Sequence, residues 1–148
     1  MTAATLSADG KLAASGNSSG IIKIWNVATG KETFTLQAHS GRILSARFSK
    51  DGDKIVSSAD DSTIRLWNVA TGKEIAQLIS FDDGEWIAIT PEGYYNASAN
   101  GDRYLNVRAG NNVYGIENYR EAFYRPDLVK IALAGGSLED FRKLAEIK

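Results

Sequence analysis

Residues 25–32 read WNVATGKE, and the same eight residues return at positions 67–74, 42 residues later. The turn that precedes each copy is repeated at the same spacing, because residues 7–11 read SADGK and residues 49–53 read SKDGD. A fixed period of about 40–45 residues is typical of an array in which each repeat forms one supersecondary unit that stacks on its neighbours. The sequence therefore predicts a repeat protein.

Four short strands are predicted in the second repeat. Residues 63–67 alternate apolar and polar side chains, as a half-buried strand does. The other three predicted strands lie between turns rich in Gly and Asp and cover residues 43–48, 54–58 and 74–79. Four such strands form one antiparallel blade. The first repeat predicts the same strands around residues 3–7, 11–15, 21–26 and 32–37.

The second repeat resembles a WD40 repeat. Members of that family bury a hydrogen-bonded tetrad in each well-formed blade, and the matching residues here are His39, Ser57, Asp61 and Trp67. The resemblance implies a β-propeller fold and a structural role for the tetrad. That role agrees with physical chemistry, because buried polar groups need partners and an indole N–H can only donate.

The flanking repeats keep only parts of this tetrad. The first retains Ser15 and Trp25. A third, degenerate repeat predicts strands at residues 85–90, 94–98, 103–108 and 113–116. It retains Ser98 and Asp102, while Arg108 occupies the Trp position. We expect Asp102 and Arg108 to form an ion pair in place of the Asp–Trp link.

The pattern changes to helix after residue 116. Helices are predicted over residues 117–124, from Pro126 to residue 134, and after residue 137. The resemblance implies an all-β fold class, WD40 propeller blades in a partial, open array, and the sequence predicts a short α-helical C-terminal tail after them. Its predicted parts are a truncated blade (1–41), a complete blade (42–83), a degenerate blade (84–116) and a helical tail (117–148).

The tail carries a second resemblance. Residues 84–86, 90–95 and 123–128 resemble the end of the propeller region in bacterial WD40 proteins, some of which continue into a caspase-like peptidase domain. This resemblance implies an alternative function, a regulatory or sensor domain of a bacterial caspase-like protease fusion. The chain itself has no Cys, and its single His is the tetrad residue.

Composition argues against several functions. The 148 residues carry 17 basic and 18 acidic side chains, for a net charge of −1, which argues against nucleic acid or an anionic membrane as a partner. Asp60-Asp61 and Asp82-Asp83 are interpreted as turns, because the spacing of a calcium loop is absent. We expect a soluble, cytoplasmic, non-enzymatic chain without metal or cofactor.

The remaining candidates for function are surface loops. WD40 propellers bind proteins and peptides around the turns between their second and third strands and before each blade. The positions that match this region are Asn17, Ser18, Arg42 and Asp60. The sequence therefore predicts a protein-interaction scaffold, the C-terminal part of a larger propeller. An open array leaves strand edges and apolar faces uncovered, so we also expect self-association or poor stability.

Overall fold

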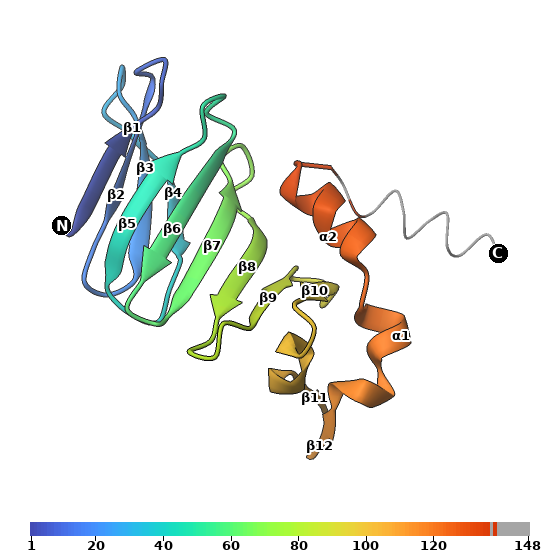
Figure 1. Cartoon of the computed structure of the whole chain (residues 1–148). Helices are drawn as coiled ribbons and strands as arrows, with labels where there is room; N and C mark the ends of the chain where they lie inside the picture. The colour runs from blue at the N-terminus through green and yellow to red at the C-terminus, as the bar shows by residue number, and fades with distance from the viewer. Residues whose placement is uncertain (137, 139–148) are drawn as a thin grey trace. The chain divides into compact units, whose positions relative to one another are not determined.

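The computed structural model describes residues 1–136 and residue 138 (Figure 1). The chain divides into two compact units, Met1–Gln77 and Leu78–Lys148, which are described in turn.

The first unit begins with a four-stranded antiparallel sheet, in the order β1-β2-β3-β4. Its strands are β1 (Ala3–Leu6), β2 (Leu12–Gly16), β3 (Ile21–Asn26) and β4 (Glu32–Gln37). Gly10 closes the first turn at a φ of +71°, a conformation that costs glycine little.

The second sheet repeats this pattern with β5 (Ile43–Phe48), β6 (Lys54–Ala59), β7 (Thr63–Asn68) and β8 (Glu74–Ser80). These strands lie in the order β5-β6-β7-β8. All eight predicted strands of the two repeats are confirmed within one or two residues, because the turn residues bound each strand in both copies.

The core of the first unit lies between the two sheets. Ile22 and Ile24 of β3 pack in one cluster with Ile43, Ile55 and Trp67 of the second sheet. Fully burying an Ile side chain contributes about 1.5–3 kcal/mol, so this contact is the main source of stability that joins the blades.

The second unit is organised differently. Strands β9 (Trp86–Ile89) and β10 (Tyr95–Ala97) form an antiparallel hairpin. A 3-10 helix, Gly101–Tyr104, follows. Strands β11 (Asn106–Ala109) and β12 (Asn112–Gly115) then pair with each other in a separate two-stranded sheet.

The prediction of one strand over residues 103–108 was wrong. A Cβ on Gly101 would lie 2.3 Å from the backbone oxygen of Trp86, so the chain passes close to β9 and turns there. Arg103 and the Tyr104 hydroxyl both bind the Asp83 carboxylate, which holds residues 103–104 in the 3-10 helix. Asp83 and Trp86 lie about 20 positions earlier in the sequence, and the local pattern of residues 103–108 did not indicate these contacts.

The tail contains a 3-10 helix, Ile116–Asn118, followed by α1 (Arg120–Phe123) and α2 (Pro126–Leu133). Pro126 occupies the start of α2, where its missing N–H costs nothing. The rings of Tyr95 and Tyr124 lie 5.4 Å apart, so aromatic contacts join the tail to the hairpin of the same unit. The predicted last helix falls outside the described residues. None of the described helices is long and apolar enough to cross a membrane.

Candidate functional site

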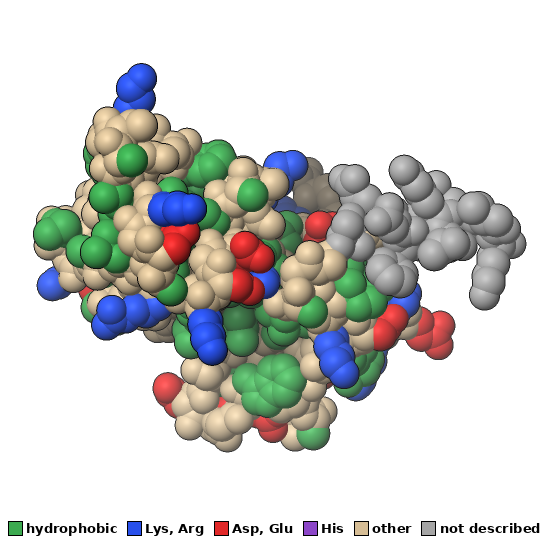
Figure 2. Space-filling view, turned by 90° about the horizontal axis from the view of Figure 1, so that it is seen from above, with side chains coloured by type: hydrophobic (Ala, Val, Ile, Leu, Met, Phe, Trp, Pro, Cys, Tyr) green, Lys and Arg blue, Asp and Glu red, His purple; other side chains and the backbone are tan. Residues whose placement is uncertain are grey.

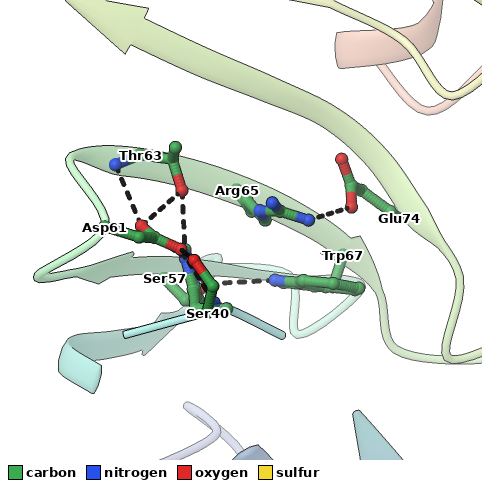
Figure 3. A network of polar contacts seen from close by, with 8 residues as sticks. Ser40, Ser57, Asp61, Thr63, Arg65, Trp67 and Glu74 are labelled. Atoms are coloured by element: carbon green, nitrogen blue, oxygen red, sulfur yellow. Dashed lines mark hydrogen bonds and ion pairs between the residues drawn. The ribbon is translucent and has the colours of Figure 1, made fainter. Parts of the chain in front are cut away.

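The structure brings the four predicted tetrad residues of the second repeat together. Figure 3 shows three of them, Ser57, Asp61 and Trp67, within their network of polar contacts. Trp67 Nε1 donates to Ser57 Oγ at 2.9 Å, and Ser57 Oγ lies 2.8 Å from His39 Nε2. His39 Nδ1 lies 3.0 Å from Asp61 Oδ2. Residues on β6, β7 and the two adjoining loops are thereby linked in one buried chain of hydrogen bonds.

The donors and acceptors fix the order of hydrogens in this chain. The indole of Trp67 can only donate, so the Ser57 oxygen accepts from it and donates its own hydrogen to His39 Nε2. His39 therefore carries its proton on Nδ1 and donates it to Asp61. The neutral ring satisfies every polar atom in the chain.

Burial and hydrogen bonding shift the pKa values of two of these groups. Burial lowers the pKa of His39 below 6.5, against the opposing pull of its hydrogen bond to Asp61. Burial alone would raise the pKa of Asp61. Hydrogen bonds from Thr63 Oγ1 and from the backbone N–H groups of Ser40 and Thr63 outweigh it and bring that pKa to about 2.

Both shifts make the first unit less stable in acid. The unfolded chain takes up a proton on His39 below pH 6.5, and one on Asp61 below pH 3.8, more readily than the folded chain does. The Asp61 contribution is therefore present above pH 3.8 and is lost as the pH falls toward 2. Urea unfolding of the wild type and of Asp61→Asn across this range should show their stability difference, about 1–2 kcal/mol at neutral pH, shrinking toward pH 2. A difference independent of pH would contradict this assignment.

The order Ser57, His39, Asp61 is also that of a hydrolase triad, in which a histidine activates a serine. Here the Ser57 side chain is fully buried, and its oxygen already accepts the Trp67 N–H. A substrate carbonyl has no path to this oxygen. The arrangement is suited to fixing strand register and loop position.

The four predicted loop positions lie around this network. The backbone N–H of Asp60 donates to Arg42 O at 3.0 Å, and that of Ile43 donates to Asn17 O at the same distance. Two loops of the second repeat and one of the first therefore meet at one edge of the first unit. Ser18, Arg42 and Asp60 are exposed there.

Asn17 has a different role from the other three. Its side-chain oxygen accepts the backbone N–H groups of Ser19 and Ile21, at 2.9 and 3.0 Å. Asn17 thus shapes the loop. The equivalent N–H in the second repeat, that of Thr63, is bound by Asp61.

The partial tetrads differ from each other. In the first repeat Trp25 Nε1 donates to Ser15 Oγ at 3.2 Å, and this pair is only half-buried. In the third segment Ser98 Oγ accepts the backbone N–H of Trp86 and donates to Glu85.

The expected ion pair between Asp102 and Arg108 was wrong. Asp102 pairs with Arg120 of α1, with Nη1 and Oδ2 3.1 Å apart, and Arg108 donates to the Gly110 backbone oxygen. Asp102 lies in the 3-10 helix, whereas Arg108 lies on β11, in the separate two-stranded sheet. The cavity beside this sheet, about 350 Å³, is mostly apolar, with Arg108 and Glu92 among its lining residues.

Several residues of the site were not identified from the sequence. Ser40 and Thr63 bind Asp61 and complete the network. An ion pair between Arg65 and Glu74, 2.9 Å, also repeats one between Lys23 and Glu32, 2.7 Å. The 42-residue spacing would have indicated the repeated pair, because both partners recur at that distance.

Comparisons with known proteins agree with this geometry. The family model for the WD domain, G-beta repeat, matches residues 1–26 and 30–68. No curated protein matches the chain. Two similar solved structures are the structure of U3-55K and the crystal structure of RRP9 WD40 repeats, each with a TM-score of 0.52 and 22% identity. Each match covers 64% of this chain and 32% of the solved chain. The repeats of the first unit are therefore similar to WD40 repeats, and its two sheets have the fold of β-propeller blades.

Proposed function

We propose that the chain is a non-enzymatic scaffold that binds a protein or peptide, and that its blades form the C-terminal part of a larger WD40 propeller. WD40 repeat domains generally mediate protein–protein interactions. The chain spans about a third of the length of the WD40 structures it resembles, 32% in each case, which supports a role within a larger array.

The observation that carries the proposal is the rigid support beneath the loops. Asp61 accepts the backbone N–H of Ser40 at 3.0 Å, and the Gly20 oxygen accepts the N–H groups of Ala38 and His39. The segment that leads into Arg42 is thus held from both repeats. A preorganised loop loses little conformational freedom on binding, which favours affinity.

The exposed groups at this edge are of opposite charge. Arg42 and Asp60 lie across from each other, joined through their backbones. Such a pair suits a peptide that carries both a positive and a negative group, because charged groups at the rim of an interface steer association and select the partner.

Peptides selected from a displayed random library against the whole chain test this proposal. Binding measured by fluorescence anisotropy should weaken about tenfold in Arg42→Glu, equivalent to about 1.4 kcal/mol. Lys50→Glu is the matched control, because it reverses an exposed charge at the opposite end of β5. A library without binders, or binders weakened only by the control substitution, would refute the proposed site.

A further inference from the structure

The outer face of the first sheet is hollowed. The hollow measures about 520 Å³ and is lined by the start of the chain, by β1, β2 and β3, and by Arg47 of β5. Met1, Ala4, Ala13, Ser15 and Trp25 are among its lining residues. Figure 2 shows hydrophobic side chains at the surface on the side that the first sheet occupies in Figure 1.

The internal repeat shows which residues become buried when the equivalent face of the second sheet is covered. The residues 42 positions later are Ile43, Ala46, Ile55, Ser57 and Trp67. All five are buried in the second sheet, and the four apolar ones belong to the core that it forms with the first sheet. Within the first unit, the hollow therefore leaves open the positions whose counterparts the second repeat buries.

The face of the first sheet that covers this core also has a counterpart in the second repeat. The first sheet covers the second with a face that includes Ala14, Ile22 and Ile24, which are 2%, 0% and 0% exposed. Their counterparts in the second repeat are Val56, Ile64 and Leu66. Val56 is 41% exposed, Ile64 is 44% exposed and Leu66 is half-buried.

Each copy of the chain thus has two versions of both surfaces of one interface. One version of each is paired between the two sheets. The other versions, the hollow of the first sheet and the face of Val56, Ile64 and Leu66, are not paired with each other. We propose that the hollow of the first sheet binds a second copy of this chain, through that copy's face of Val56, Ile64 and Leu66. The inference rests on the proposed role as part of a larger propeller and identifies the source of the neighbouring blade.

The contact would join two different surfaces, so it is head-to-tail. A head-to-tail contact uses one hollow and one covering face of each copy, and the assembly either closes into a ring or continues to grow. Ala4, in the hollow, and Ile64, on the covering face, lie on different repeats, so each surface can be blocked without touching the other.

Sedimentation velocity and light scattering on the full chain test the proposal. The wild type should show a mass above that of one chain, and the mass should rise with concentration. Ala4→Arg, in the hollow, and Ile64→Arg, on the covering face, should each raise the dissociation constant at least about tenfold. Ala8→Arg is the matched control, because Ala8 is exposed in the turn between β1 and β2, outside the hollow, and it should associate like the wild type.

Mixing the two variants gives the decisive result. Each variant keeps the half that the other has lost, so an equimolar mixture should form a one-to-one dimer and grow no further. Dimer formation would also show that both variants fold. A monomeric wild type, or a mixture that stays monomeric, would overturn the inference, while peptide binding that depends on Arg42 would still support the proposed function.

Discussion

Replacing Trp67 by alanine should lower the free energy of unfolding by about 3–5 kcal/mol, because the change leaves a cavity between the two sheets. The Trp67 side chain is 5% exposed and belongs to the core of the first unit. The substitution also removes the indole N–H that Ser57 accepts. Urea unfolding followed by far-UV circular dichroism measures the loss.

Trp25→Ala is the matched control. Trp25 occupies the same position of the first repeat, makes the same kind of bond to Ser15, and is half-buried in the outer hollow. The Trp25→Ala substitution should lower the free energy of unfolding by about 1–2 kcal/mol, since the Trp25 side chain buries less apolar surface than that of Trp67. Both variants are best measured in the Ala4→Arg background, so that association does not contribute. Equal losses at the two positions would show that packing between the sheets does not distinguish the repeats.

Gly20→Ala should destabilise the first unit by about 3–4 kcal/mol, from two sources. Gly20 has a φ of +78°, and a left-handed conformation costs a non-glycine residue about 1–2 kcal/mol. An added Cβ would also lie 2.0 Å from the His39 backbone oxygen. The backbone must move, and the hydrogen bonds from Ala38 and His39 to Gly20, each contributing about 1 kcal/mol, are broken or weakened.

Gly10→Ala separates strain from collision. Gly10 has a similar φ of +71°, but no atom lies within 4 Å of the added Cβ. It should therefore lose only the conformational part, about 1–2 kcal/mol. Thermal unfolding of both variants, with the wild type alongside, measures the difference. Similar losses of stability in Gly10→Ala and Gly20→Ala would show that the loop before the second blade moves to accommodate the added Cβ at little cost.

The sequence predicted the first unit well because each signal there is local and occurs twice. The Asp-Gly turns and the WNVATGKE segments bound the strands in both copies, and the tetrad residues follow from their place in the repeat. The same spacing did not show that Asn17 takes over part of the work of Asp61, because an amide two positions earlier reaches an equivalent N–H.

Prediction was weaker in the second unit because its decisive contacts are not local. Asp102 pairs with Arg120, and the Asp83 carboxylate binds Arg103 and Tyr104. The sequence separations between these partners do not follow the repeat period. Residues 103–108 were predicted as the third strand of a degenerate repeat, yet their first two positions close a 3-10 helix. Tertiary partners override a short local pattern when the segment has only a few backbone bonds to lose.

The hydrogen-bond chain of the second blade also has a consequence for proton movement. A row of hydroxyl groups can pass a proton along and then reset by turning every hydrogen around. The chain from Trp67 through Ser57 and His39 to Asp61 cannot reset in this way, because its first member only donates and its ionised last member only accepts. This chain of hydrogen bonds is therefore not able to relay one proton after another, in contrast to a row of hydroxyl groups.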